Sequence, residues 1–408
     1  MYKFLVINVD ELWLKGKNRP LYFKALKDHL KKVIKLYHPE GAKLAFDRQR
    51  YILSMHSGIP AGTIDGILKI PGIHSVNPAL SVPSQFSAIY PVLREELQKI
   101  VGDKKATFKV ITKRVDKRFP QSSMQVNCDL GGMILNEFPN LKVDVHTPEI
   151  PIHVKILDEQ IYLTTKTLLG VGGLPCGMSG HLVTMISGGF DSPVASYLMS
   201  KRGCKQTFIF FYAYPFVGDE VKDKIIELLK KLGQYQKYCR LYIVPFGELQ
   251  SQVAEACHAE YRTVLFRHAM VQTANLLADT IKADAILTGD ALGQVSSQTM
   301  GNIALMDGSS KRPILRPLVG YNKMEIINLA KKIKTFDISV LPHDDACSMF
   351  APKHPIIRPD RVYWQRLVCA LDLTENIQKC LRESQVYQIN PVGDLSQIDN
   401  FVTNTFKK

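Results

Sequence analysis

The sequence lacks the patterns that define several common protein classes. No two of its eight cysteines form a Cys-x-x-Cys pair, which excludes a zinc ribbon, a thioredoxin-like redox pair and iron–sulfur sites of that spacing. No run of about 18 apolar residues occurs, so we predict no membrane-spanning helix. The N-terminal residues become acidic too early for a secretory signal peptide. We therefore expect free thiols in a reducing, cytoplasmic compartment.

A Walker A loop (Gly-x-x-x-x-Gly-Lys-Ser/Thr) is also absent, but a different glycine pattern is present. Residues 182–193 read LVTMISGGFDSP, which is a β-prone run, a Ser-Gly-Gly turn and the start of a helix. We predict Ser192 as the helix N-cap, Pro193 in the first turn and Asp191 near the positive helix end. The glycines permit unusual backbone angles, and the main-chain N–H groups would hold phosphates. The alternative is an ordinary strand–turn–helix corner.

Length and charge indicate a large chain with an anionic partner. At 408 residues we expect two or three domains, each with its own core. The formal charge is +14 and the pI is near 9.3, which favours nucleic acid over a membrane surface as partner.

The N-terminal part predicts a small α+β module over residues 1–60. Residues 2–9 are expected to form a strand, 21–37 a basic amphipathic helix, and 43–56 a further strand or hairpin. Between the first two lies LKGKNR, with the cations Lys15, Lys17 and Arg19 in a turn-forming context. These cations are candidates for RNA contacts; the alternative is a solvated loop.

Residues 61–166 have a different pattern, in which short β-like runs alternate with proline and glycine. Between residues 104 and 118 seven Lys or Arg face a single carboxylate, Asp116. Clustered cations flanked by aromatic residues suit a ribose–phosphate backbone, although a solvated strand face is the alternative. The candidate RNA contacts are Lys109, Lys113, Arg114, Lys117 and Arg118.

Residues 167–180 read as a linker, and from residue 181 strands alternate with helices up to about residue 400. This alternation predicts a doubly wound parallel sheet that binds its ligand at the carboxyl ends of the strands. Ser187-Gly188-Gly189 and Gly289-Asp290 both follow predicted strands directly. Both segments should therefore open into the same crevice.

Three groups of motifs resemble known families. SGGFDS resembles the loop of the PP-loop ATP pyrophosphatases, and KRVDKRFP together with SSMQVNCDLG resembles the THUMP RNA-binding domain. LTGDALGQVSSQT, LRPLVG and LKGKNR are similar to stretches of the ThiI-type tRNA 4-thiouridine synthetases. The resemblance implies an N-terminal ferredoxin-like domain (1–60), a THUMP domain (61–166), the linker, a PP-loop domain (181–400) and a tail (401–408).

The resemblance also implies an ATP site, with Mg²⁺ bound near Asp191. It implies a catalytic role for Asp191 as well. Phe210 departs from the His that family members commonly carry there, but it keeps an apolar wall for adenine. Arg267 would contact the nucleotide; without the resemblance a surface arginine would be preferred. The implied contacts are Met185, Ile186, Ser187, Gly188, Gly189, Asp191, Ser192, Phe210, Phe211, Arg267, Gly289 and Gln298.

Residues 341–355 resemble the family's cysteine-bearing loop, and Cys347 falls on its thiol, which implies a catalytic role for Cys347 in presenting the sulfur. A structural thiol is the alternative. The neighbouring Asp344 and Asp345 would raise the thiol pKa, whereas nearby His and Lys residues would lower it. The chain ends at Lys408, too soon for the rhodanese domain of many relatives, so a separate cysteine desulfurase is the expected persulfide donor.

The implied reaction is ATP-dependent transfer of sulfur to uridine 8 of tRNA, through adenylation of the uridine O4. A homodimer is possible, because family members are often dimers. Two other functions stay open: a different PP-loop ligase (2-thiolating or amide-forming), and a non-catalytic tRNA-binding protein.

Overall fold

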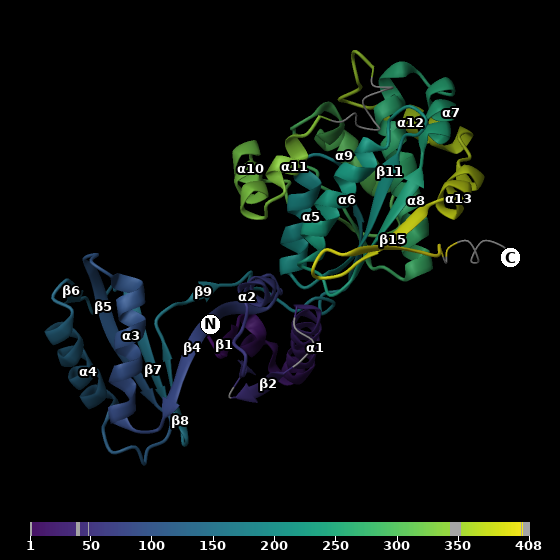
Figure 1. Cartoon of the computed structure of the whole chain (residues 1–408). Coiled ribbons are helices and arrows are strands. Elements are labelled where there is room, and N and C mark those ends of the chain that lie inside the picture. The colour runs from purple at the N-terminus through teal and green to yellow at the C-terminus, as the bar shows by residue number, and fades with distance from the viewer. Residues whose placement is uncertain (1, 38–40, 48, 343–351, 401, 403–408) are drawn as a thin grey trace. The chain divides into compact units, whose positions relative to one another are not determined.

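The computed structural model describes residues 2–37, 41–47, 49–342, 352–400 and 402. The chain forms two compact units (Figure 1). Unit 1 comprises residues 1–11, 30–69 and 73–172, and unit 2 comprises residues 12–29, 70–72 and 173–408. None of the described helices has the length and apolar character needed to cross a membrane.

Unit 1 is built on one sheet with the strand order β2-β3-β1-β4-β8-β7-β5-β6, and β9 pairs with β4. The 11-residue strand β4 joins its two halves, because β4 pairs with β1 over its first part and with β8 over its last part. The strands are β1 (Phe4–Val9), β2 (Ala42–Asp47), β3 (Arg50–Met55), β4 (Ile73–Pro83), β5 (Ala106–Arg114), β6 (Leu141–Val143), β7 (Ile150–Ile156), β8 (Gln160–Thr164) and β9 (Leu168–Leu169).

Among the described residues, helices cover one face of the β5–β8 part of this sheet and leave the other open. Leu93 and Leu97 of α3, with Val126 and Leu130 of α4, share a buried core with Phe108 and its neighbours on the sheet (Figure 1). The opposite face of β5 and β7 carries polar and basic side chains. The helices of this part of the chain are α1 (Arg19–Tyr37), α2 (Ala61–Leu68), α3 (Ile89–Val101) and α4 (Ser123–Glu137), with short 3-10 segments η1 (Glu11–Asn18) and η2 (Phe86–Ala88).

The predicted strands and the helix over residues 21–37 are confirmed, but the sequence reading missed α2, α3 and α4. In α4 the buried residues are Val126, Leu130 and Ile134, a single narrow row with four-residue spacing. Two glycines and several polar residues surround that row, and they conceal its helical period.

Unit 2 contains a seven-stranded sheet with the order β14-β13-β10-β11-β12-β15-β16. The first five strands are parallel, β15 pairs antiparallel with β12, and β16 pairs antiparallel with β15. The order reverses direction between β10 and β13, which makes that position the topological switch point. The strands are β10 (His181–Met185), β11 (Lys205–Tyr212), β12 (Cys239–Pro245), β13 (Ala285–Leu287), β14 (Ile314–Leu315), β15 (Gln385–Ile389) and β16 (Leu395–Ile398).

Helices pack on both faces of this sheet, as expected for parallel strands. On one face α8 contributes Leu265, Phe266 and Ala269 to a core with Ile209 and Phe211 of β11. On the other face lie α5 and α6 (Figure 1). The helices of unit 2 are α5 (Asp191–Lys201), α6 (Glu220–Gly233), α7 (Gly247–Glu255), α8 (Arg262–Ile281), α9 (Met300–Gly308), α10 (Lys323–Lys332), α11 (Phe336–Val340), α12 (Arg361–Ala370) and α13 (Thr374–Arg382), with 3-10 segments η3 (Ala259–Tyr261) and η4 (Ser296–Gln298).

The predicted α/β architecture of unit 2 is confirmed, with one addition: the antiparallel pair β15–β16 that closes one edge of the sheet. The exact domain boundaries inferred from the sequence stay a prediction.

Candidate nucleotide and RNA-binding site

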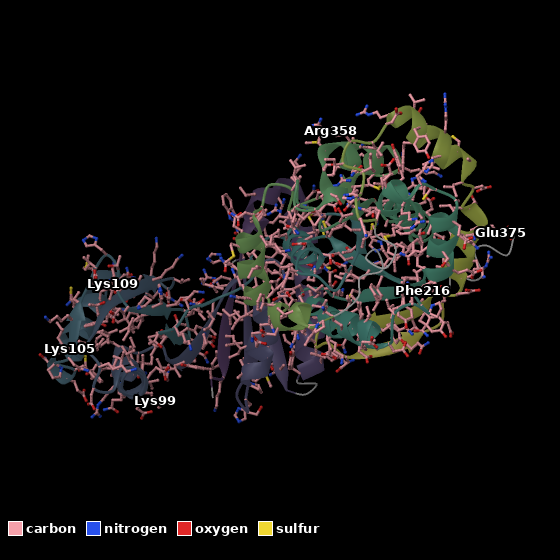
Figure 2. The ribbon with its side chains drawn as sticks, turned by 90° about the horizontal axis from the view of Figure 1, so that it is seen from above. Lys99, Lys105, Lys109, Phe216, Arg358 and Glu375 are labelled. Carbon is pink, nitrogen blue, oxygen red and sulfur yellow. The ribbon has the colours of Figure 1, made fainter. Side chains whose placement is uncertain are left out.

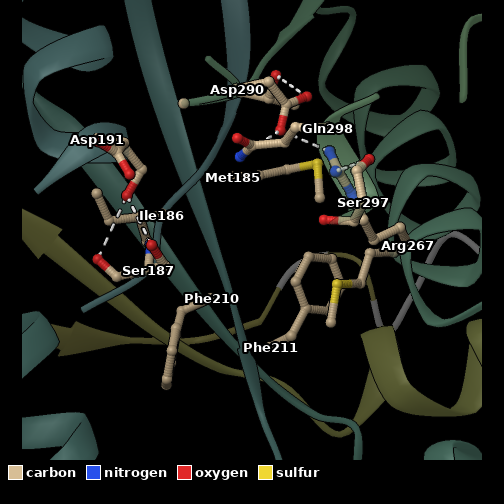
Figure 3. A pocket seen from close by; sticks show the side chains of 14 residues that line it. Met185, Ile186, Ser187, Asp191, Phe210, Phe211, Arg267, Asp290, Ser297 and Gln298 are labelled. Carbon is tan, nitrogen blue, oxygen red and sulfur yellow. Dashed lines mark hydrogen bonds and ion pairs between the residues drawn. The ribbon is translucent and has the colours of Figure 1, made fainter. Parts of the chain in front are cut away.

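A cavity of ≈ 240 Å³ opens at the switch point of the unit 2 sheet (Figure 3). Figure 3 shows Ser187 and Asp191 on one side of it, with Arg267, Asp290 and Gln298 on the other. Ten of the twelve predicted ATP contacts line the cavity: Met185, Ile186, Ser187, Asp191, Ser192, Phe210, Phe211, Arg267, Gly289 and Gln298. The other two, Gly188 and Gly189, follow Ser187 in the loop but are not lining residues. Met270, Thr288, Asp290 and Ser297 complete the lining.

The loop after β10 differs from the prediction in how it is capped. Helix α5 begins at Asp191 with Phe190 as its N-cap residue, so the prediction of Ser192 as N-cap is wrong. The Ser192 hydroxyl instead accepts a hydrogen bond from the main-chain N–H of Ser187 at 2.9 Å. It closes the loop onto itself, because the helix starts before Ser192 and turns its side chain inward.

Neither Gly188 nor Gly189 has a positive φ among the described residues. The loop therefore does not use the left-handed backbone angles that glycine permits. Their contribution is the missing side chain, which leaves the main-chain N–H groups of the loop accessible to an anion.

Gly289, directly after β13, is packed against the start of α5. A Cβ atom on Gly289 would lie 2.5 Å from the main-chain N of Ser192 and 2.8 Å from the carbonyl C of Asp191. Both neighbours are backbone atoms, so a side chain at this position would force the two segments apart. The absence of a side chain on Gly289 therefore brings the carboxyl end of β13 against the phosphate loop.

Asp290 is the electrostatic centre of the opposite wall, and the sequence reading did not assign it a role. Its side chain is 6% exposed and pairs with Arg267 at 2.6 Å and Arg316 at 3.2 Å. The hydroxyl of Thr288 donates to it at 2.9 Å. Burial alone would raise the pKa of Asp290, but the two arginines and this hydrogen bond outweigh it and hold the pKa below its usual value.

Arg267 is fixed in the pocket wall and is not a surface residue. Its side chain is 13% exposed, and its Nη1 also donates to the carbonyl oxygen of Ser297 at 2.9 Å. Beside it, the buried Oε1 of Gln298 has no hydrogen-bond partner in the described structure. A buried acceptor without a partner is costly, so this atom fits a donor on a ligand, such as the amino group of adenine or a ribose hydroxyl.

Asp191 is held at the mouth of the pocket by two side chains that the sequence reading missed. Lys323, the first residue of α10, lies 3.0 Å from its Oδ1, and Gln294 donates to its Oδ2 at 2.9 Å. The ammonium of Lys323, carried on a flexible side chain, therefore lies beside the phosphate loop. A signal existed, because Asn322-Lys323-Met324-Glu325 forms a capping box that starts a helix here.

The open face of the unit 1 sheet gathers cations from two strands. Register pairs Lys113 with Lys155 and Ile111 with His153, and Lys109 lies on the same face. Lys113, His153 and Lys155 line a cavity of ≈ 350 Å³ on this face, and Lys109 is not among its lining residues. His153 and Lys155 were not predicted as RNA contacts. Their strand partners, Ile111 and Lys113, lie on the open face, so His153 and Lys155 lie there too.

The other predicted RNA contacts have varied settings. Arg114 lies on the other face of β5, where its Nη1 donates to the carbonyl oxygens of Phe119 and Gln121 at 3.0 Å. The exposed Arg118 pairs with Asp116 at 2.9 Å, and Lys117 is exposed. Lys15 and Lys17 lie in η1 and Arg19 begins α1.

Cys347 lies outside the described residues. The seven other cysteines are unpaired thiols, and burial raises the pKa of Cys204 and Cys380 to about 11. A buried thiol that stays protonated is a poor nucleophile. Also among the described residues, no cluster of His, Cys, Asp or Glu has the geometry of a metal site.

A PP-loop at the switch point of a doubly wound sheet, with a sheet-borne basic face in the other unit, defines a nucleotide-binding protein with an RNA-binding module. Three family models match: ThiI ferredoxin-like domain at residues 4–77, THUMP domain at 83–166, and thiamine biosynthesis protein (ThiI) at 177–367. No rhodanese model is among them.

The chain is similar over nearly all of its length to proteins named probable tRNA sulfurtransferase. It is 35% identical to that of Moorella thermoacetica, over 97% of this chain and 100% of the relative. It is 36% identical to that of a Geobacillus species, over 95% and 96%. The chain therefore belongs to the ThiI family of tRNA sulfurtransferases.

A solved structure agrees with this assignment. The structure matches a crystal structure of a 4-thiouridine synthetase–RNA complex with bound ATP, with a TM-score of 0.86 and 29% identity. The match covers 96% of this chain and all of the other.

Proposed function

We infer that the protein is a tRNA uracil 4-sulfurtransferase that uses ATP to make 4-thiouridine at position 8 of tRNA. The observation that carries this inference is the pocket of unit 2. There a phosphate loop, the Arg267–Asp290–Arg316 cluster and the unpartnered Gln298 oxygen converge in a chain that matches the ATP-bound synthetase along its length.

The residues of the pocket divide into an adenosine side and a phosphate side. Phe211 and Met185 supply apolar surface for adenine, and Gln298 supplies the acceptor. The loop from Ser187 to Asp191 would hold the phosphates with its main-chain N–H groups. Pre-oriented donors of this kind stabilise charge that develops as pyrophosphate leaves.

The chemistry needs activation because the uracil O4 is a poor leaving group. The uridine O4 attacks the α-phosphorus, the bond from that phosphorus to the bridging oxygen breaks, and pyrophosphate leaves. Sulfur then adds at C4, and AMP departs with the former O4. The ammonium of Lys323 is the side chain best placed to follow the developing negative charge, since it already lies at the loop beside Asp191.

Mg²⁺ fits this site at one carboxylate. Asp290 is buried and engaged by Arg267, Arg316 and Thr288. Asp191 is more exposed, and its oxygens are held by Lys323 and Gln294; it is the candidate ligand, and an ion bound there would displace the ammonium of Lys323. When bound there with the nucleotide, the ion would neutralise phosphate charge.

The sulfur donor in this proposal is a persulfide on Cys347, loaded by a cysteine desulfurase. The outer sulfur attacks C4 as AMP leaves, which links the tRNA sulfur to Cys347 through a disulfide. An external thiol then attacks the Cys347 sulfur, and the electron pair of the broken S–S bond remains on the tRNA sulfur. We further propose that tRNA binds the basic face of Lys109, Lys113 and Lys155, and that the enzyme acts as a homodimer.

The test is nucleoside mass spectrometry of tRNA incubated with the protein, ATP and a persulfide donor, together with a pyrophosphate assay. We expect 4-thiouridine and pyrophosphate, both dependent on tRNA. A 2-thiolated or amide-bearing nucleoside would instead identify another PP-loop ligase, and absence of pyrophosphate release would identify a tRNA-binding protein without catalysis. Cys347→Ala should keep pyrophosphate release and lose thiolation; full thiolation in that variant would remove Cys347 from the mechanism.

A further inference from the structure

A second cavity lies at the carboxyl ends of β11 and β12, on the α6 face of the unit 2 sheet. Register pairs Tyr212 with Pro245 and Ile243 with Gln385, so these side chains share one sheet face. The cavity has a volume of ≈ 230 Å³ and combines aromatic, apolar and polar walls: Tyr212, Tyr214, Pro245, Lys222, Glu383 and Gln385.

This cavity adjoins the nucleotide pocket through a row of aromatic rings. Phe210 lines the nucleotide pocket, and its ring centroid lies 6.5 Å from that of Tyr212. The rings of Tyr212 and Tyr214 follow at 6.0 Å with an interplanar angle of 27°. Tyr214 is 61% exposed and the nearby Phe216, labelled in Figure 2, is 40% exposed, so the row ends at the surface.

The ring of Tyr212 is held rigidly. Its hydroxyl donates to Asp219 at 2.9 Å, and Lys222 lies 4.3 Å above the ring while pairing with Asp219 at 2.8 Å. The main chain of Tyr214 rests directly on Gly247, where a Cβ atom would lie 2.1 Å from the Tyr214 carbonyl oxygen. The exposed ring therefore projects from a fixed backbone, which reduces the entropy lost when a ligand stacks on it.

We propose that this cavity binds an unstacked nucleobase of the RNA substrate on the ring of Tyr214 and brings it beside the nucleotide pocket. The inference rests on the proposed function. Aromatic rings bind single-stranded bases by stacking, and polar side chains around them read the base edges. Glu383 accepts hydrogen bonds and would repel a phosphate, and the ammonium of Lys222 is already paired with Asp219. The wall therefore suits the N–H edge of a base better than the phosphate backbone. Uracil carries such a donor at N3.

The test compares substitutions of Tyr214 with a matched control in the full-length enzyme. Tyr238 is also exposed, at 46%, and directly precedes β12, at the end of this strand opposite to the proposed cavity. We expect Y214A to lower kcat/KM for tRNA about tenfold or more, as loss of one base–aromatic stack does. Y214F should restore the wild-type value because stacking needs only the ring, and Y238A should change nothing. The Kd for ATP should stay constant throughout.

Wild-type activity toward tRNA in Y214A, or an equal loss in Y238A, would overturn the proposal. A second measurement covers the case that Y214A does not fold: wild-type enzyme is irradiated with tRNA that carries 5-iodouridine at the target position, and the crosslinked peptide is mapped. A crosslink at Tyr214 supports the proposal, and crosslinks confined to other segments refute it. Wild-type protein that makes no 4-thiouridine would refute the proposed function itself, which keeps the two failures distinguishable.

Discussion

The contact between Gly289 and the start of α5 predicts a large effect from one added methyl group. In Gly289→Ala the new Cβ would lie 2.5 Å from the Ser192 nitrogen and 2.8 Å from the Ser192 Cα. Contacts this short cannot persist, and both partners are backbone, so β13 and α5 must separate. Overpacking of this kind costs about 1–3 kcal/mol.

The effect should appear in both stability and nucleotide affinity. For a unit of this size each kcal/mol corresponds to a fall in Tm of about 2–4 °C. The displaced residues are those whose N–H groups would face the phosphates, so we expect the Kd for ATP to rise about tenfold, which corresponds to about 1.4 kcal/mol of lost binding free energy. Differential scanning fluorimetry and isothermal titration calorimetry measure the two quantities.

The matched control is Gly320→Ala, since a Cβ atom on Gly320 has no neighbour within 4 Å and its φ is not positive. This variant should keep the wild-type Tm and Kd. If Gly289→Ala melts and binds ATP as the wild type does, the close approach of β13 to the phosphate loop has no energetic consequence and the argument fails.

Three further outcomes follow from the structure. Burial lowers the pKa of His268 from 6.5 to about 4, so its neutral form contributes stability above pH 6.5 that is lost as pH falls toward 4, by up to about 1.4 kcal/mol per pH unit. His268→Gln should flatten the decline of Tm between pH 7 and 5, and an unchanged slope would refute this. Lys323→Met should reduce pyrophosphate release at least tenfold while tRNA binding is retained, and wild-type turnover would exclude a role for its ammonium. Lys113→Gln should weaken tRNA binding and reduce its salt dependence by about one ion. Arg118→Gln should weaken tRNA binding less, because Asp116 already neutralises that arginine. Equal losses in the two variants would argue against tRNA binding on the open sheet face.

The sequence predicted the nucleotide pocket well because its determinants are local. A β-prone run followed by SGGFDS fixes a loop after a strand, and parallel strands bring such loops to one edge. The pairing of Asp290 with Arg316 was not predicted, because the two residues are 26 positions apart in the sequence and only the folded sheet brings them together. Ser192 was misassigned because Ser before Pro is a common start of a helix, while here the helix begins earlier.

In unit 1 the strands were visible in the sequence and three helices were not. β5 has an alternating pattern of burial that its sequence shows, whereas α4 depends on the sheet to bury three residues. The side of the sheet on which each cation lies could be assigned only from the register between β5 and β7. That register separates Lys113, on the open face, from Arg114, whose guanidinium stabilises a turn.

The short edges of the unit 2 sheet have a consequence for how the protein fails. Residues 208–212 read FIFFY, an apolar, uncharged, β-prone segment of the kind that assembles into fibrils once exposed. In the folded chain this segment lies in β11, the centre of the sheet, and the sheet ends in strands of two and four residues, too short to recruit another molecule. Loss of unit 2 structure would uncover FIFFY at once, so destabilised variants should precipitate on heating instead of refolding on cooling.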